Sequence, residues 1–418
     1  MAGLRHFRLV AGVAVVLATA FCSQAAPPKP GSALLEVGYA TPGVLAAADL
    51  TVVRTVPALH VAEVRAPLDT LAELRGTPGI RFAQPARPRA LAGDGSPLAA
   101  AAGADEWQLH ATHEDLVPAA VLEAAASIRI AVVDTGADLR APVLAAKEPA
   151  GYDVMTNRPG VSDPNGHGSF VASLAAGSVA AGNRMAGFGG QARLLVVRAG
   201  SGPGDGTFTD VDEAAGIVYA VDHGARIVNL SIGGTTSSPI EKAAIRYAIR
   251  KGVLLVAPAG NDYASGSPVE YPAALLQPVG SNGAGGSGLV VGASTETGER
   301  APFSNVGSTV SLAAPGVNVL GAISPLSSPS SYPRAISTAR PAQALYGYAS
   351  GTSFSAPEVS GAAALVWAAD PALSAQQVAA ILKVTASGAG SWNPDLGYGV
   401  IDVAAAVARA QALAAQRS

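Results

Sequence analysis

Short runs of apolar, mostly β-branched residues alternate with longer segments of helical periodicity through the middle of the chain. A strand covered on both faces of a parallel sheet is apolar throughout, so these runs predict buried strands. The predicted strands cover residues 128–134, 193–198, 226–231, 252–256 and 289–294. Helical patterns at 211–223 and 240–251 lie between them. The chain therefore predicts an α/β domain with three αβα layers around a mostly parallel central sheet.

The N-terminal part carries a smaller pattern of a different kind. It reads as strand, helix, strand, strand, helix and strand, over residues 33–38, 42–48, 51–57, 59–66, 68–75 and 80–85. This is the β-α-β-β-α-β order of a ferredoxin-like α+β unit. Gly76 is expected to end the second helix. A small domain therefore precedes the large one.

Residues 1–26 have the layout of a secretory signal peptide, with Arg5 and Arg8 before an apolar run and small residues at the end. The run is too short to span a membrane stably, so we expect export. Cys22 is the only cysteine, and cleavage after residue 25 or 26 leaves a mature protein without a thiol. A lipid anchor on Cys22 is the alternative, although the preceding Phe21 is too large for the usual lipoprotein pattern.

Composition and charge exclude several classes of protein. The chain has 418 residues, of which 49% are hydrophobic, and a net charge of −3. The sequence contains no basic stripe of the kind that binds nucleic acids. It also contains no second apolar span that would anchor the mature form in a membrane. The glycine-rich segment 283–288 spells a dinucleotide fingerprint, but it precedes a predicted strand instead of following one and opening a helix. An NAD- or ATP-dependent enzyme is therefore not expected.

Ser353 lies in a turn of small residues, 351–357, directly before the apolar helical pattern 361–369. A serine at the start of a helix has backbone N–H groups around it and the positive end of the helix dipole beneath any developing negative charge. Ser and Thr are also the ordinary N-cap residues of helices. Taken alone, this segment is better explained as a simple cap.

Two other segments carry the partners that a serine nucleophile needs. Asp134 ends a predicted strand, and ligands of parallel α/β sheets bind outside the carboxyl ends of the strands. His167 lies between Gly166 and Gly168 and opens a helical pattern that ends near residue 181. The alternative for Asp134 is a turn aspartate. The remaining histidines are interpreted as leader, surface or helix-end residues, namely His6, His60, His110, His113 and His223.

Asp134, His167 and Ser353, in that chain order, resemble the catalytic triad of the subtilisin-like serine peptidase family. A fourth motif is a buried strand that ends in Asn261, where the family carries its oxyanion-hole amide. The resemblance covers about residues 105–410. It implies an endopeptidase that hydrolyses peptide bonds in proteins through an acyl-enzyme, with His167 as base and Asp134 orienting it.

The resemblance also implies a substrate site. One wall of the primary pocket and the strand that pairs with an extended peptide are expected from Ser231, Ile232 and Gly233. The opposite wall is expected from Pro258, Ala259 and Gly260. Asp262 is expected near the rim, where it would favour basic residues.

Several positions depart from the family's commonest pattern. Phe354 replaces the usual Met after the nucleophile, and Glu358 places a charge on a helix where His is frequent. A Pro/Ser-rich insertion, 321–348, precedes the nucleophile and is expected to be a mobile loop. It either gates the cleft or is a solvated surface loop.

The same resemblance implies the organisation of a zymogen. We expect a signal peptide at 1–26, an inhibitory propeptide at 27–90, a linker with the activation site at 91–104, the peptidase domain at 105–410 and a tail at 411–418. The expected partners are protein or peptide substrates and the chain's own propeptide, with a monomeric, secreted product. No cofactor is required for the chemistry. Family members often bind calcium, but the sequence contains no ligand cluster to which we assign a metal. The alternatives are a stand-alone binding domain for the leader and a catalytically silent binding protein for the whole.

Overall fold

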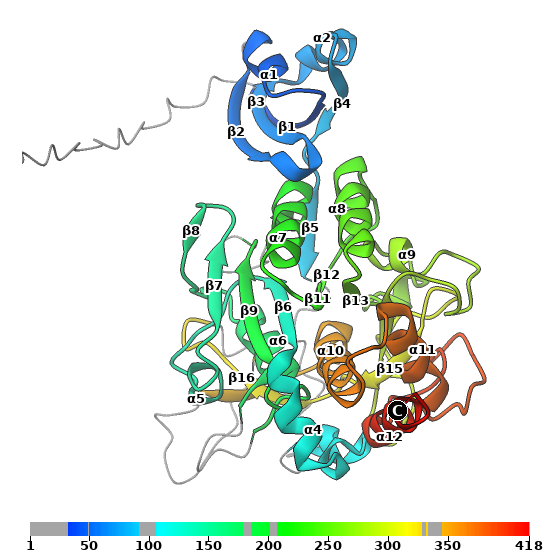
Figure 1. Ribbon diagram of the computed structural model, residues 1–418. Coiled ribbons are helices and arrows are strands. Elements are labelled where there is room, and N and C mark those ends of the chain that lie inside the picture. Colours follow the sequence, from blue (N-terminus) through cyan, green and yellow to red (C-terminus); the bar gives the residue numbers. More distant parts are fainter. Residues whose placement is uncertain are drawn as a thin grey trace, which may run out of the picture.

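The computed structural model describes residues 32–48, 50–91, 106–178, 185–200, 207–327, 332 and 345–417. They form a small N-terminal domain and a large domain below it in the view of Figure 1. The expected signal peptide and linker residues 92–104 lie outside the described residues. Within the described ranges, no helix is both long enough and apolar enough to cross a membrane.

The small domain, which we call the leader domain, has the six predicted elements. They are β1 (Ser32–Tyr39), α1 (Gly43–Ala47), β2 (Thr51–Val56), β3 (Val61–Pro67), α2 (Leu71–Gly76) and β4 (Ile80–Pro85). The strands form one antiparallel sheet in the order β2-β3-β1-β4. Gly76 is the last residue of α2, but it is not left-handed, and the extended Thr77 follows it.

The leader sheet has one apolar and one charged face because side chains alternate along a strand. Leu35 and Val37 of β1 pack into the core beneath the helices, together with Val64 of β3. Glu36 and Glu63, which are paired across β1 and β3, point to the other face. That face lies against the large domain, and both carboxylates are buried there.

The large domain is built on an eight-stranded sheet in the order β15-β14-β13-β11-β6-β9-β7-β8. Its strands are β6 (Arg129–Asp134), β7 (Ala150–Asp153), β8 (Arg158–Pro159), β9 (Arg193–Arg198), β11 (Ile227–Asn229), β13 (Leu254–Pro258), β14 (Leu289–Ser294) and β15 (Leu312–Pro315). All neighbours are parallel except the edge pair β7 and β8. The predicted three-layer αβα fold with a mostly parallel sheet is confirmed.

Helices cover both faces of this sheet. The helices of the large domain are α3 (Trp107–Ala111), α4 (Ala119–Ala124), α5 (Pro142–Ala145), α6 (His167–Ala176), α7 (Asp210–Asp222), α8 (Pro239–Arg250), α9 (Ala273–Leu276), α10 (Thr352–Ala369), α11 (Ala375–Thr385) and α12 (Val403–Ala415). In β6, Ile130 and Val132 join the core with α6 and α10, whereas Ala131 and Val133 join the core with α7 and α8.

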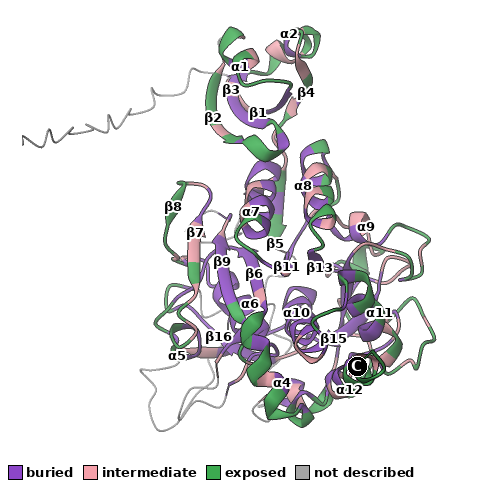
Figure 2. Cartoon of the chain, in the orientation of Figure 1, coloured by how far each residue is buried: buried purple, intermediate pink, exposed green. Residues whose placement is uncertain are grey.

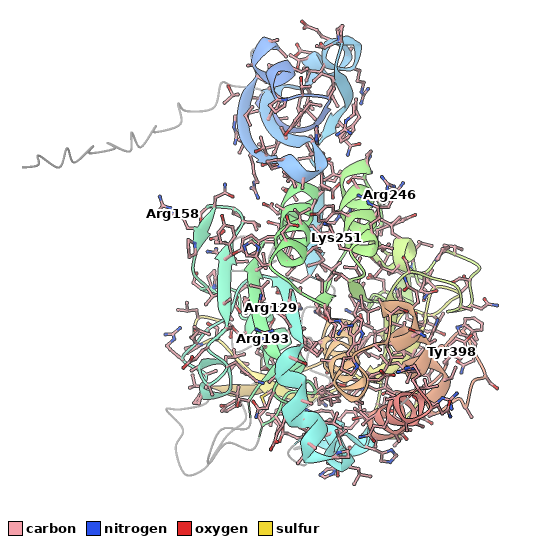
Figure 3. All side chains as sticks on the ribbon, in the orientation of Figure 1. Arg129, Arg158, Arg193, Arg246, Lys251 and Tyr398 are labelled. Carbon is pink, nitrogen blue, oxygen red and sulfur yellow. The ribbon has the colours of Figure 1, made fainter. Side chains whose placement is uncertain are left out.

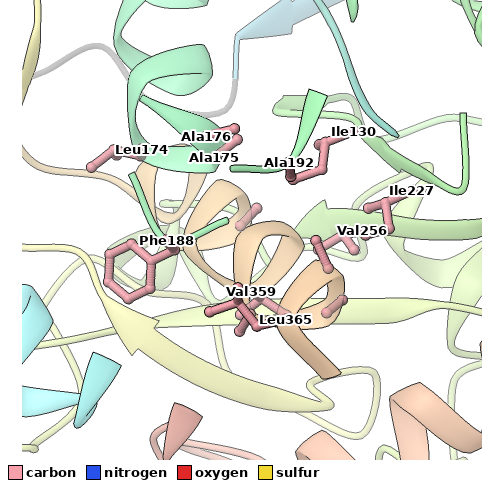
Figure 4. Close-up of a cluster of buried hydrophobic side chains, with 14 of the residues drawn as sticks. Ile130, Leu174, Ala175, Ala176, Phe188, Ala192, Ile227, Val256, Val359 and Leu365 are labelled. Atoms are coloured by element: carbon pink, nitrogen blue, oxygen red, sulfur yellow. The ribbon is translucent and has the colours of Figure 1, made fainter. Parts of the chain in front are cut away.

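Figure 4 shows the first of these cores, where Ile130 and Val256 of the sheet approach Val359 and Leu365 of α10. Helix α10 is buried along almost its whole length, in agreement with its lack of a polar face. Figure 2 shows the same contrast, with buried residues in the sheet and in α10 and exposed residues on the outer helices. Burial therefore fixes α10 against one face of the central sheet.

Several predicted boundaries differ from the structure. Strand β11 ends at Asn229 rather than at residue 231, and β13 ends at Pro258, three residues before Asn261. Helix α6 ends at Ala176 rather than near residue 181, because the chain turns to an extended conformation at Gly177. Helix α12 extends to Ala415, so most of the expected tail 411–418 is helical, as its alanine-rich composition favours. The insertion 321–348 joins β16 (Val319–Ala322) to β17 (Tyr346–Ala349), which pair antiparallel.

One further strand connects the two domains. Strand β5 (Pro88–Leu91) leaves the leader domain and runs between β10 (Phe208–Thr209) and β12 (Ile232–Gly233) of the large domain. Both pairings are antiparallel. Leu91, the first residue of the expected linker, is thus part of a strand.

Candidate active site

The three candidate catalytic residues lie at the carboxyl edge of the central sheet. Asp134 is the last residue of β6, His167 is the first residue of α6, and Ser353 is the second residue of α10. The opposite edge is marked by Arg129 and Arg193, which are paired at the starts of β6 and β9 and lie near each other in Figure 3. The fold therefore brings together residues that are more than 200 positions apart in sequence.

Asp134 and His167 form a fully buried pair. Nδ1 of His167 lies 2.9 Å from Oδ1 and 3.0 Å from Oδ2 of Asp134. The backbone N–H of Thr135 donates to Oδ1 of Asp134 at 2.7 Å, which holds the carboxylate in place. Among the described residues, Nε2 of His167 has no hydrogen-bond partner. The imidazole is therefore oriented through one nitrogen, and its other nitrogen is available for proton transfer.

Ser353 is tied to the segment between β11 and β12. Its Oγ donates to the carbonyl oxygen of Ser231 at 3.3 Å. In return, Oγ of Ser231 donates to the carbonyl oxygen of Ser353 at 2.8 Å and accepts from Nδ2 of Asn229 at the same distance. These bonds fix the start of α10 relative to the predicted peptide-binding strand.

The side-chain amide of Asn261 is oriented by the residue before Ser353. Oδ1 of Asn261 accepts from the backbone N–H of Thr352 at 2.9 Å and from its Oγ1 at 3.0 Å. Because the oxygen is held in this way, the Nδ2 donor end is fixed as well. Thr352 was not singled out by the sequence analysis, although its position directly before Ser353 was a usable signal.

A second residue missed by the sequence analysis is the buried Asp163. Its Oδ1 accepts from Oγ1 of Thr135 at 2.8 Å and from the backbone N–H of Gly166 at the same distance. Its Oδ2 accepts from both the N–H and the Oγ of Ser169, at 2.7 Å and 2.6 Å. Asp163 thus links the loop after β6 to the first turn of α6, which carries His167. Its place four residues before His167 was the available signal.

Gly168 allows α6 to approach the loop after β6. A Cβ at this position would lie 2.3 Å from the carbonyl oxygen of Gly136 and 3.2 Å from Oδ1 of Asp134. Any side chain would therefore separate His167 from its carboxylate. This contact explains why a glycine follows His167.

A cluster of aromatic rings lies on one side of the histidine. The ring of Phe354 lies 5.3 Å from that of His167 and 4.7 Å from that of Phe170, measured between centroids. Tyr332, from the insertion, lies 5.8 Å from Phe170 and is itself buried. The departure at Phe354 therefore fills a space next to the imidazole, and at least one residue of the insertion packs into the same cluster.

The second departure from the family pattern, Glu358, lies inside α10 and is fully buried. Neither of its carboxylate oxygens has a hydrogen-bond partner among the described residues. Burial raises the pKa of Glu358 well above its usual range. Burial therefore favours the neutral form of this side chain.

The predicted substrate residues lie on two segments beside Ser353. Ile232 and Gly233 form β12, which pairs with β5 of the leader. Pro258 ends β13, and Ala259 is 6% exposed. Gly260 is left-handed, with φ +101°, and its N–H donates to Oγ1 of Thr352 at 3.2 Å.

Asp262 follows on the surface beside this wall, where its N–H donates to Oδ1 of Asn305. His110 and His113 are surface residues as expected, and each ring faces an aspartate, Asp115 and Asp402 respectively. Among the described residues, no group of three or more His, Cys, Asp or Glu side chains is arranged to hold a metal ion.

Comparisons with known proteins place this arrangement in a family. The sequence model of the subtilase family matches residues 125–399. Thermitase from Thermoactinomyces vulgaris is 34% identical over 267 residues, which cover 63% of this chain and 84% of thermitase. Subtilisin BL from Lederbergia lenta is 33% identical over 282 residues, covering 67% of this chain and 90% of that protein.

A thermophilic serine proteinase from Bacillus sp. (strain AK1) is 35% identical over 237 residues, which cover 57% of this chain but only 51% of that longer protein. Among solved structures, fervidolysin from Fervidobacterium pennivorans, a keratinolytic enzyme related to subtilisin, matches with a TM-score of 0.72 and 26% identity. That match covers 90% of this chain and 61% of fervidolysin. The leader-peptide-processing protease EpiP from Staphylococcus aureus, at 18% identity and a TM-score of 0.69, shares the fold and covers 90% of this chain and 99% of its own.

The family model covers more than half of the chain, and the matched relatives are serine peptidases that need no cofactor for catalysis. The chain is therefore a member of the subtilase family, with the subtilisin-like fold of a serine-type endopeptidase.

Proposed function

We propose that this protein is a secreted endopeptidase, made as a self-processing zymogen, in which Asp134, His167 and Ser353 form the catalytic triad. The observation that carries the proposal is the buried contact between Asp134 and Nδ1 of His167 at the sheet edge where α10 presents Ser353. A carboxylate in this position fixes the histidine tautomer and stabilises the imidazolium that forms during the reaction.

In the proposed mechanism, Oγ of Ser353 attacks the carbonyl carbon of the scissile bond while Nε2 of His167 takes the hydroxyl proton. The negative charge that develops on the carbonyl oxygen is stabilised by Nδ2 of Asn261 and the backbone N–H of Ser353. His167 then gives its proton to the leaving amine, and the acyl-enzyme remains. Water repeats the sequence in the second half-reaction and releases the acid.

The leader supports the zymogen part of the proposal. Strand β5 lies antiparallel to Ile232 and Gly233, the segment predicted to pair with an extended substrate. A peptide bound by backbone pairing in this slot competes with any substrate for the same hydrogen bonds. We therefore assign the leader domain as an intramolecular inhibitor, with activation by cleavage within 91–104. The remaining pocket residues, Pro258 to Gly260, are assigned to the opposite wall, and the exposed Asp262 favours basic residues at its rim.

The test is mass spectrometry of the purified secreted protein after incubation with an unstructured protein substrate and a serine-directed active-site label. We expect the wild type to lose its leader, carry the label and cut the substrate, whereas Ser353→Ala does none of these. Ser355→Ala is the matched control, because Ser355 lies on the same turn but its Oγ donates to the carbonyl oxygen of Pro315. It should retain all three behaviours.

One result would favour the alternative of a catalytically silent binding protein. In that case the wild type stays full length and unlabelled, and the substrate survives even after another protease has removed the leader.

A further inference from the structure

The side chain of Arg89, in the middle of β5, is inserted completely into the large domain. Its guanidinium is fully buried and is surrounded by three carboxylates. Nε lies 2.8 Å from Oδ1 of Asp210 and 3.5 Å from Oε2 of Glu213, and Nη2 lies 2.8 Å from Oε2 of Glu241. Nη1 also donates to the carbonyl oxygen of Thr236. We call the cavity formed by these four residues the arginine pocket.

The backbone of the large domain is shaped to admit this side chain. A Cβ on Gly234, the residue after β12, would lie 3.0 Å from Nη1 and 3.5 Å from Cδ of Arg89. Only a glycine leaves room for the arginine without a shift of one of the two groups. The pocket is thus complementary to an arginine in shape as well as in charge.

Two of the carboxylates have an ordinary structural explanation. Asp210 is the first residue of α7, and Glu241 belongs to the capping box of α8 with Ser238, so both stabilise helix starts. Glu213 also lies in the first turn of α7. It lies beyond the capping box of α7, it is fully buried, and neither of its oxygens has a hydrogen-bond partner among the described residues. Its described electrostatic partner of opposite charge is Arg89.

The leader supplies the charge that the pocket needs. Burial and the neighbouring carboxylates raise the pKa of Glu213 well above its usual range and that of Glu241 to about 7. Lys242 lowers the pKa of Glu241, and Arg87 of the leader lowers that of Asp210, but Arg89 acts on all three acids. Buried carboxylates that lose their cation are costly, so an empty pocket favours a new cationic occupant. A planar guanidinium suits several carboxylates at once.

The register of β5 gives the position of this occupant in a substrate. Ala90 pairs with Gly233 and Leu91 pairs with Ile232. A bound peptide that continues this register by one residue reaches Ser231, whose carbonyl oxygen is 3.3 Å from Oγ of Ser353. The residue opposite Ser231 is therefore next to the nucleophile and carries the scissile carbonyl. The arginine pocket then receives the side chain three residues earlier.

On this geometry, and resting on the proposed endopeptidase function, we propose that the arginine pocket is a specificity subsite. It selects substrates with arginine at the fourth residue before the cleaved bond. The leader occupies the subsite with Arg89 before activation, and substrates occupy it afterwards. The same register predicts that the chain cuts its own leader between Ala92 and Gly93, inside the expected linker.

The test uses the self-processed enzyme and four capped tetrapeptide p-nitroanilides. Their sequence follows the leader, X-Ala-Leu-Ala, with X as arginine, lysine, citrulline or norleucine. Citrulline has the shape of arginine without its charge. At pH 8 we expect kcat/KM for the arginine peptide to exceed that for citrulline by at least about tenfold, since buried charge pairs contribute this much or more across interfaces. Lysine should lie between them, because it lacks the planar fork.

Variants of the pocket then assign the effect to its residues. Glu213→Gln should reduce the arginine-to-citrulline ratio several-fold. Asp222→Asn, on the last residue of the same helix, is the matched control, because it removes the same charge from an exposed site and should leave the ratio unchanged. In the wild type, the ratio should also fall as the pH drops below about 7, where Glu241 takes up a proton.

The outcomes separate this proposal from the proposed function. If the wild type cleaves all four peptides with equal kcat/KM, the pocket only anchors the leader and the specificity proposal is wrong, although the protein is a peptidase. If no peptide is cleaved and no serine label is taken up, the proposed function itself fails. If Glu213→Gln does not fold, the arginine-to-citrulline ratio of the wild type and its pH dependence still decide the question.

Discussion

Two buried charged centres lie close to β12, and they are completed in different ways. At the proposed catalytic centre, Asp134 and His167 both belong to the large domain, and Thr135 of the same domain holds the carboxylate. At the arginine pocket, the carboxylates belong to the large domain but the cation comes from the leader. The first centre lies within one domain, whereas the second is completed by the leader.

This difference separates catalysis from recognition. A reacting group must be oriented before the substrate arrives, because reorganisation during the reaction would add to the barrier. A recognition site can remain incomplete, because it selects the peptide that supplies the missing charge. Changes at the catalytic centre should therefore alter kcat, whereas changes at the pocket should alter which peptide is used and how tightly the leader is held.

The largest effect is expected for Asp134→Asn. An amide cannot stabilise the imidazolium and favours the wrong histidine tautomer, so kcat should fall by about 10⁴-fold. The measurement is kcat on a peptide substrate, with protein concentration determined independently of activity. Asp115→Asn is the matched control, because it breaks another Asp–His contact, with His110, on the surface. If Asp134→Asn kept kcat within tenfold, the role given to this carboxylate would be incorrect.

A smaller effect is expected for Asn261→Ala. Removing a single oxyanion donor should reduce kcat by about 10²–10³-fold, with KM little changed, because the contact forms mainly in the transition state. Steady-state kinetics over a range of substrate concentrations separates the two constants. A rise in KM with an unchanged kcat would assign Asn261 to ground-state binding instead.

The leader interface should respond to pH through Glu36. Burial, followed by repulsion from Asp210, raises the pKa of Glu36 to about 8 in the docked leader, while Gln84 donates to its carboxylate and Glu63 lies opposite on β3. A carboxyl whose pKa is raised by docking holds its proton in the complex. Glu36 therefore contributes most to the affinity of the leader for the large domain at acidic pH. This contribution is lost as the pH rises toward 8, and the affinity falls by at most about tenfold per pH unit.

The measurement for this prediction is the time at which activity appears after the full-length protein is purified at low pH and transferred to buffers between pH 5 and 9. Activation should accelerate as the pH rises. Glu36→Gln cannot ionise, so its activation should depend less on pH over this range. An equal pH dependence in both proteins would exclude Glu36 as the source.

The smallest catalytic effect is expected for Glu358→Gln, which should change stability instead. Because burial raises the pKa of Glu358, ionisation opposes folding increasingly as the pH rises above the value for the unfolded chain. The amide removes this cost, so the variant should be more stable at pH 8 than the parent protein, with a difference that shrinks toward pH 4. Thermal unfolding of both proteins in a Ser353→Ala background avoids self-digestion. A constant difference across this range would contradict the explanation.

Much of the fold was accessible from the sequence, because the relevant signals are local. The strands at Arg193–Arg198 and Leu289–Ser294 have the predicted bounds, and so does the last strand of the leader sheet. The catalytic motifs were also local, since each candidate residue is beside its own turn or helix start. Asp134 and His167 lie at the predicted ends of elements for this reason, whereas Asn261 follows the end of β13 by three residues.

The remaining features depend on long-range contacts that no local pattern contains. Asp210 and Glu241 have the ordinary appearance of helix caps, and only the tertiary structure shows that they share Arg89 with Glu213. Tyr332 packs beside Phe170 although its segment has the composition of a loop. In each case the partner residue lies in another element, and the sequence does not show how the two elements are aligned in space.

The three-stranded arrangement β10-β5-β12 has one further consequence, for the surface of the activated protein. Strands β10 and β12 do not pair with each other but share β5 as their common neighbour. When β5 departs, both present unpaired backbone groups to solvent, and open strand edges invite other chains to add to them. In the proposed zymogen, the leader covers these strand edges before cleavage, and bound substrate covers them afterwards.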